Sequence, residues 1–168
     1  CRLGGVSVDP EVSCACRSAV DRLAIEGYDV VELDEVIEPL PPQFEQYWKA
    51  GFAHRLRTIP PPRHNDLDPG FLALAQEGLA VSVAELDAAH AARARLVARF
   101  RRVTLDYDLL LTPTMPTPAP RADGTYHSAQ FDRWEHAVPF TLPFNLTGQP
   151  AASIPVGLSG LGLPIGLQ

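Results

Sequence analysis

The distribution of proline is the feature that most restricts how this chain can fold. Seventeen of its 168 residues are proline, about twice the usual share. Most lie between Pro39 and Pro69 or between Pro113 and Pro164, and the stretch between these two clusters contains none. Because proline fixes φ and lacks an amide hydrogen, we expect irregular paths in the two clusters and helices between them.

Composition and charge narrow the class of protein. The chain is 46% hydrophobic and 20% charged, which favours a globular core over disorder. Its net charge of −6 argues against nucleic acid or an anionic membrane as a partner, because both require a basic face. No apolar run reaches the roughly 18 residues of a membrane span, and no secretory signal is present. The sequence therefore predicts a cytoplasmic protein.

The residues that usually bind metals or cofactors do not form a recognisable motif. Cys1, Cys14 and Cys16 are too few and too close for a disulfide framework or a zinc site, so we interpret them as free thiols. Phosphate-binding and dinucleotide-binding glycine patterns, H-E-x-x-H and G-x-S-x-G are absent. The sequence thus predicts no metal and no cofactor. Of the five scattered histidines, His90 is interpreted as a packed side chain, and His127 and His136 are open to a site role.

Capping signals predict three helices, and the Pro41-Pro42 pair, which can open a helix, predicts a fourth. Asp9-Pro10 and Asp68-Pro69 each combine a capping aspartate with a proline at the first helical position, and Ser82-Val-Ala-Glu85 is a capping box. The predicted helices run from Pro10 to about Gly27, from Pro41 to about Arg57, from Pro69 onward, and from Ser82 to about Val103. Pro60–Arg63 is interpreted as a rigid connector, with a polyproline ligand as the alternative.

Short apolar runs predict strands between and after the helices. Leu109, Leu110 and Leu111 follow one another, which favours a strand buried on both faces of a sheet. The predicted strands are Tyr28–Leu33, Asp106–Pro113, Ala151–Val156 and Leu163–Gln168. Helices that alternate with such strands are typical of an α/β fold.

The stretch PFTLPFNLTGQPAASIPVG, residues 139–157, combines apolar side chains with four prolines. We expect an ordered, irregular path, because proline disfavours helix interiors and paired strands. Gly148 would supply a positive φ or a close backbone approach. Such a path either positions groups such as Asn145 and Thr147 for a site, or fills space beside the sheet. The residues alone leave both interpretations open.

Three segments in this order and spacing, DYDLLLTPTMPTPAP, PFTLPFNLTGQPAASIPVG and GLPIGLQ, resemble the C-terminal half of the amidase signature enzymes. The helix start VDPEV and the run VDRLAIEGYDVVELD are also similar to that half. The resemblance implies an α/β fold with a mixed, twisted β-sheet core surrounded by helices. It also implies that residues 1–168 are the C-terminal portion of a single amidase domain, incomplete at both ends.

The family hydrolyses carboxamides with a serine nucleophile, activated through a second, cis-bonded serine and a lysine, without a metal. The glycine- and serine-rich segment that carries these groups is absent here, so we expect no catalytic residue in this chain. Its only lysine, Lys49, lies on a predicted helix and is given no catalytic role. The expected partners are a small amide substrate and the missing N-terminal half of the same polypeptide, and a homodimer is left open.

By the same resemblance, the loop before PFNLTG faces the substrate, which points to Trp134, Val138 and Phe140, with Asn145 as a further candidate from the PFNLTG path itself. The nearest acid is Glu135, six residues before Thr141, which favours a general amidase over a glutamyl-tRNA amidotransferase A-type subunit. A non-catalytic binding or scaffold domain of the same ancestry is the other alternative. A glycine- and serine-rich coding segment upstream of Cys1 would distinguish the enzyme from the scaffold.

Overall fold

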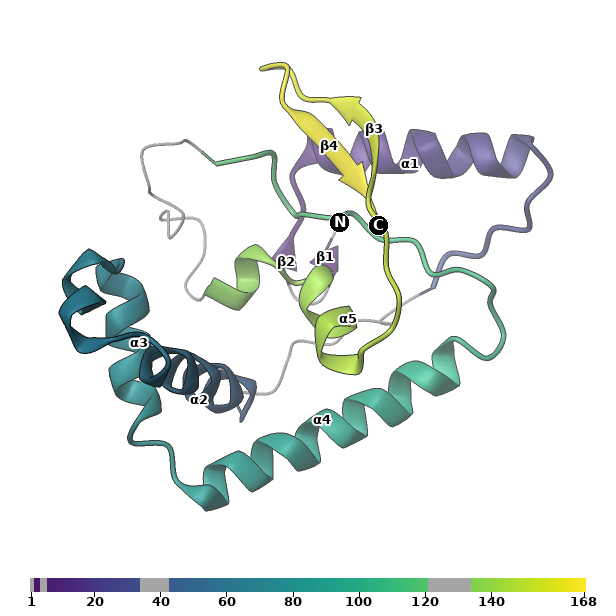
Figure 1. Cartoon of the computed structure of the whole chain (residues 1–168). Coiled ribbons are helices and arrows are strands. Elements are labelled where there is room, and N and C mark those ends of the chain that lie inside the picture. Colours follow the sequence, from purple (N-terminus) through teal and green to yellow (C-terminus); the bar gives the residue numbers. More distant parts are fainter. Residues whose placement is uncertain (1, 4–5, 34–42, 121–133) are drawn as a thin grey trace. The chain divides into compact units, whose positions relative to one another are not determined.

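The structure is a computed structural model that describes residues 2–3, 6–33, 43–120 and 134–168. The chain divides into two compact units. The first comprises Cys1–Pro39 and Phe100–Gln168, and the second comprises Leu40–Arg99. Figure 1 shows the order of their elements along the chain.

The described strands of the first unit form two antiparallel hairpins. Strand β1 (Arg2–Leu3) pairs with β2 (Val6–Ser7), and β3 (Ile154–Leu158) pairs with β4 (Pro164–Leu167). The register of the second hairpin shifts between Pro155 and Gly157, which marks a β-bulge. The first hairpin was not predicted from the sequence, whereas β3 and β4 lie within a few residues of their predicted positions.

Residues 112–116 form backbone hydrogen bonds both to the β4 region and to the residue that precedes the first helix. Thr112 and Gln168 exchange both backbone hydrogen bonds, at 3.0 and 2.8 Å, and the Thr114 N–H donates to the Gly166 carbonyl at 2.9 Å. Just after this paired segment, the Pro116 carbonyl accepts a hydrogen bond from the Asp9 N–H at 2.8 Å. Residues 112–116 therefore lie between the β3–β4 hairpin and the chain that enters helix α1.

Helix α1 (Pro10–Ile25) covers one face of the β3–β4 hairpin (Figure 1). Asp9 caps it by accepting from the Glu11 N–H at 2.8 Å. A Cβ placed on Gly157 would lie 3.3 Å from the Cβ of Ala15, so the strand approaches the helix closely where it has no side chain. The Glu11 carboxylate accepts from the Gly160 N–H at 3.0 Å, which ties the tip of the hairpin to the first turn of the helix.

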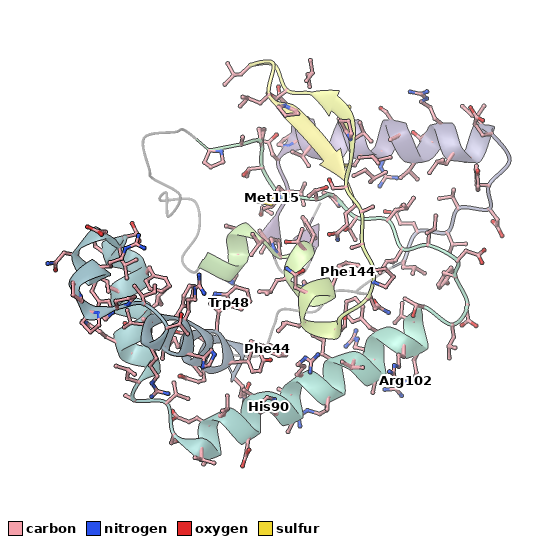
Figure 2. The ribbon with its side chains drawn as sticks, in the orientation of Figure 1. Phe44, Trp48, His90, Arg102, Met115 and Phe144 are labelled. Atoms are coloured by element: carbon pink, nitrogen blue, oxygen red, sulfur yellow. The ribbon has the colours of Figure 1, made fainter. Side chains whose placement is uncertain are left out.

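Helix α5 (Thr141–Thr147) corrects the irregular path expected over these residues. Pro143 is the third helical residue, so it lies in the first turn, where an N–H has no intrahelical acceptor and its loss costs little. The helix ends at Gly148, whose φ of 72° confirms the expected positive φ. Phe144 packs edge-on against Phe100 with ring centroids 5.5 Å apart, which anchors α5 to the end of helix α4 (Figure 2).

The described part of the second unit is helical. It contains α2 (Gln43–Arg57), the 3₁₀ helix η1 (Pro61–Asp66), α3 (Pro69–Gly78) and most of α4 (Val83–Val103). Three predicted helix starts are confirmed: Asp9 caps α1 as described above, Asp68 accepts from the Phe71 N–H at 2.9 Å, and Ser82 and Glu85 form the reciprocal capping box. Pro41 and Pro42 lie outside the described residues.

Aromatic side chains join the helices of the second unit. Phe52 of α2 meets Phe71 of α3 edge-on at 5.4 Å, and Trp48 meets Phe52 at 6.3 Å. His90 on α4 is exposed, and its ring contacts Tyr47 edge-on at 5.3 Å, which agrees with a packing role for this histidine (Figure 2).

Two strand predictions and one alternative are wrong. Tyr28–Leu33 forms no strand, and the predicted Asp106–Pro113 strand pairs only from Thr112 onward. Leu109 is 77% exposed in this chain, so the expected burial on both faces does not occur here. Pro61–Asp66 is a 3₁₀ helix, which rules out the extended polyproline conformation for this segment and supports the connector interpretation.

Replacing Gly78 with alanine should destabilise the second unit. A Cβ at Gly78 would overlap the backbone carbonyl of Lys49 and lie 3.0 Å from the Cβ of Ala53, so α2 and α3 would have to separate. We expect a loss of about 1–3 kcal/mol in the free energy of unfolding of the intact protein, measured by urea denaturation. Gly51→Ala is the matched control, because a Cβ there meets nothing within 4 Å in α2. It should raise stability by about 0.5–1 kcal/mol, and equal effects of the two changes would contradict the close packing.

Candidate functional site

An open pocket of about 350 Å³ lies in the first unit, beside the β3–β4 hairpin. Three separate parts of the chain form it: the 114–120 segment, the entry to β3, and strand β4, with one residue of α1. Its described lining consists of Val12, Thr114, Met115, Thr117, Pro118, Ala119, Pro120, Ser153, Pro155, Pro164, Ile165 and Gly166. The lining is therefore apolar apart from three hydroxyl groups.

Two of these hydroxyl groups form a pair. The Oγ1 of Thr114 and the Oγ of Ser153 are 2.6 Å apart and share a hydrogen bond. Gly166 lies beneath them, because a Cβ placed there would be 2.7 Å from the Thr114 oxygen and 2.8 Å from the Ser153 oxygen. A glycine at position 166 is thus what allows the hydroxyl pair to approach the backbone of β4. This part of the site was not predicted from the sequence, in which Thr114 and Ser153 are ordinary hydroxyl residues near prolines and carry no signal for the contact.

The structure brings Val138 and Phe140 together at the start of α5. The Val138 carbonyl accepts from the Leu142 N–H at 3.1 Å, and the Phe140 carbonyl accepts from the Gln168 side-chain amide at 3.1 Å. Phe140 is 0% exposed, whereas Asn145 is exposed on α5. Trp134 begins the 3₁₀ helix η2 (Trp134–Ala137). The side chains of Trp134 and Glu135 are not among the described parts of the structure, and neither is any part of His127. Among the described side chains, Val138, Phe140 and Asn145 do not line the 350 Å³ pocket, and the role of all four candidates in substrate binding stays a prediction.

Lys49 is held in two ion pairs in the second unit. Its Nζ lies 2.5 Å from Glu45 of α2 and 2.7 Å from Glu77 of α3. Hydrogen bonds to Glu45 and then to Glu77 raise the pKa of this amine above its ordinary value of 10.5. A lysine that acts as a base needs a lowered pKa, so these contacts indicate a protonated structural cation that fastens α2 to α3.

Two further described nucleophiles, Cys16 and Ser159, have structural contacts. The Cys16 thiol is buried against the Gly166 carbonyl at 3.8 Å, and burial raises its pKa, which favours the unreactive thiol form. Ser159 accepts the N–H groups of Leu161 and Leu163 and shapes the β3–β4 turn. Within the described ranges, no group of three or more His, Cys, Asp or Glu side chains could hold a metal ion. Nor does any helix there have the length and apolarity needed to cross a bilayer.

With this geometry in hand, comparison with known proteins identifies the family. The family model for Amidase matches residues 2–168, and the chain therefore belongs to the amidase family. A lipoamidase of Enterococcus faecalis is 29% identical over 98% of this chain and 27% of its own length. The A-type subunit of the glutamyl-tRNA(Gln) amidotransferase of Streptococcus equi subsp. zooepidemicus is 43% identical over 45% of this chain and 15% of its own length.

Solved structures confirm the predicted fold class, that of the amidase signature enzymes. The structure of 6-aminohexanoate cyclic dimer hydrolase complexed with substrate superposes with a TM-score of 0.80 at 24% identity. It is matched over 95% of this chain and 37% of its own chain. The present chain therefore spans between about a seventh and two fifths of the lengths of these relatives.

A substitution at Lys49 separates a structural cation from a catalytic one. In the intact protein, Lys49→Met should leave kcat for amide hydrolysis within a factor of about three, because the amine lies in ion pairs between helices. The same change should lower the free energy of unfolding by about 1 kcal/mol, because two carboxylates lose their partner. Since folding raises the pKa, this contribution is present below pH 10.5 and disappears as the pH rises past the raised value. A loss of 10²-fold or more in kcat would contradict the structural role.

A pair of substitutions at Gly148 tests how α5 is held in place. Gly148→Val should destabilise the intact protein by about 1–2 kcal/mol, because a β-branched residue is strained at a φ of 72°. Gly148→Asn is the matched control, since asparagine tolerates this conformation and a Cβ there meets nothing within 4 Å. The measurement is the thermal unfolding midpoint of each variant. Identical midpoints for Gly148→Val and Gly148→Asn would contradict the requirement for a positive φ at this position.

Proposed function

We propose that this chain is the C-terminal portion of an amidase that hydrolyses a carboxamide to a carboxylate and ammonia or an amine. The observation that carries the proposal is the match of the amidase family model to residues 2–168. The lipoamidase relative supports it, because that protein aligns with 98% of this chain while the chain spans only 27% of it. The rest of such an enzyme would come from further sequence of the same polypeptide.

In this proposal the chain supplies structure and substrate contacts, and the reacting groups lie elsewhere. A serine, activated through a cis-bonded serine and a lysine, would attack the amide carbonyl, release the amine and leave an acyl-enzyme that water hydrolyses. The described residues support this division. Lys49 is paired with Glu45 and Glu77, and the Thr114 and Ser153 hydroxyls are paired with each other. A nucleophilic serine instead needs a base within hydrogen-bond reach.

An A-type subunit of a glutamyl-tRNA(Gln) amidotransferase is the second candidate, because one such protein is 43% identical over 76 residues. We favour a general amidase, because the alignment to the lipoamidase extends over 98% of the chain and that to the amidotransferase over 45%. We further propose a cytoplasmic location, which agrees with the free thiols of Cys14 and Cys16.

The test compares the 168-residue chain with the complete polypeptide. We expect the complete protein to hydrolyse short aliphatic or aromatic amides, and the 168-residue chain to release no product in the same assay. Ammonia or amine release is measured at equal protein concentration, with a denatured sample as the blank. Turnover by the short chain that survives replacement of all its serines would overturn the assignment of chemistry to other residues. A complete reading frame without a glycine- and serine-rich segment would favour the scaffold alternative.

A further inference from the structure

We propose that the pocket beside the β3–β4 hairpin is a substrate subsite for uncharged amides, in which the Thr114–Ser153 hydroxyl pair binds a carboxamide group. The inference rests on the proposed function and adds the site and the class of substrate. Its starting point is the combination of an apolar hollow of about 350 Å³ and a hydroxyl pair with a separation of 2.6 Å at its wall.

The hydroxyl pair has the hydrogen-bonding capacity that an amide requires. Each hydroxyl group offers one donor and two acceptor lone pairs. The bond between Thr114 and Ser153 uses one donor and one lone pair, so one O–H and several lone pairs are left. A carboxamide presents a carbonyl acceptor and an N–H donor. The pair can therefore donate to the carbonyl and accept from the N–H of the same ligand.

The charge of the pocket favours a neutral ligand. None of the described residues that line it is acidic or basic, so an ion bound there would meet no opposite charge among them and would have only hydroxyl groups as side-chain partners. A charge that gives up part of its water without meeting an opposite charge is more costly to place there than a neutral polar group. The pocket should therefore select neutral amides over amides of similar shape that carry a carboxylate.

The walls are stiff on one side and adaptable on another. Pro118, Pro155 and Pro164 have fixed φ angles, and the contact over Gly166 sets the height of the hydroxyl pair above β4. Met115 supplies a flexible thioether side chain that can follow the shape of an apolar group (Figure 2). A volume of about 350 Å³ is at the small end for ligand pockets, which suits a short acyl or amine group.

Binding can be measured without catalysis, because Met115 is the only methionine of this sequence and lines the pocket. In the intact protein labelled with ¹³C-methyl methionine, the Met115 resonance is assigned through Met115→Leu. Butyramide and butyrate, which have nearly the same shape, are then titrated separately. We expect butyramide to shift the Met115 resonance and butyrate to leave it unchanged. No shift with butyramide, or an equal shift with both, would overturn the subsite.

Substitutions then test the hydroxyl pair. Thr114→Val and Ser153→Ala should each weaken the butyramide-dependent shift and lower kcat/KM for neutral amides by about tenfold, mainly through KM, because each removes one hydrogen bond to the ligand. Ser18→Ala, on the exposed side of α1, is the control and should behave as the wild type. If a pocket variant fails to fold, the butyramide and butyrate titration of the wild type still decides the proposal.

The two readouts separate this inference from the proposed function. A butyramide shift at Met115 without hydrolysis of any amide by the intact protein would support the subsite and count against the amidase proposal. Amide hydrolysis by the intact protein without a shift, and without an effect of Thr114→Val or Ser153→Ala, would support the amidase and remove the subsite.

Discussion

The first unit depends on the backbone pairing between residues 112–114 and strand β4. Thr112 and Gln168 exchange hydrogen bonds, Thr114 bonds to Gly166, and Pro116 then accepts from Asp9 at the entrance to α1. Three parts of the chain that are distant in sequence meet through these few bonds. The pocket exists only where they meet, because its lining comes from α1, the 114–120 segment, the entry to β3 and β4. Changes that loosen this pairing would therefore affect the fold and the site together.

The helices could be predicted because their signals are local. Asp9, Asp68 and the Ser82–Glu85 pair each bond to N–H groups within three residues, so the sequence contains both partners. Strands lack this property, since a strand requires a neighbour that the local sequence does not specify. Tyr28–Leu33 has a β-rich composition but no strand partner in the described chain, and Leu109 is exposed although it lies in an apolar run. The helix Thr141–Thr147 was not predicted, because the energetic cost of a proline in a helix depends on its position, and Pro143 lies in the first turn.

The site was harder to predict than the fold, for a physical reason. Thr114 and Ser153 are ordinary hydroxyl residues in the sequence, and they become a pair only because Gly166, from a third segment, leaves room for both. Nothing in the spacing of these residues indicates such a contact. The resemblance to a family supplied the wall candidates Trp134, Val138, Phe140 and Asn145. The exclusion of Lys49 from catalysis rested on its sequence context and is now supported by its two ion pairs.

The position of Pro155 has a consequence for how this chain meets others. Gly166 directs its carbonyl toward Thr114, so Pro155, its register partner on β3, turns its own backbone nitrogen away from β4 and toward the outer side of the hairpin. That nitrogen carries no hydrogen, so a strand from another copy of the chain that paired with β3 would lack one hydrogen-bond donor at this position. The bulge next to it also breaks the regular spacing of the remaining groups. The proline and the bulge together make the outer edge of β3 a poor template for strand pairing between two copies of the chain. This holds although β3 carries exposed apolar residues such as Ile154 and Leu158.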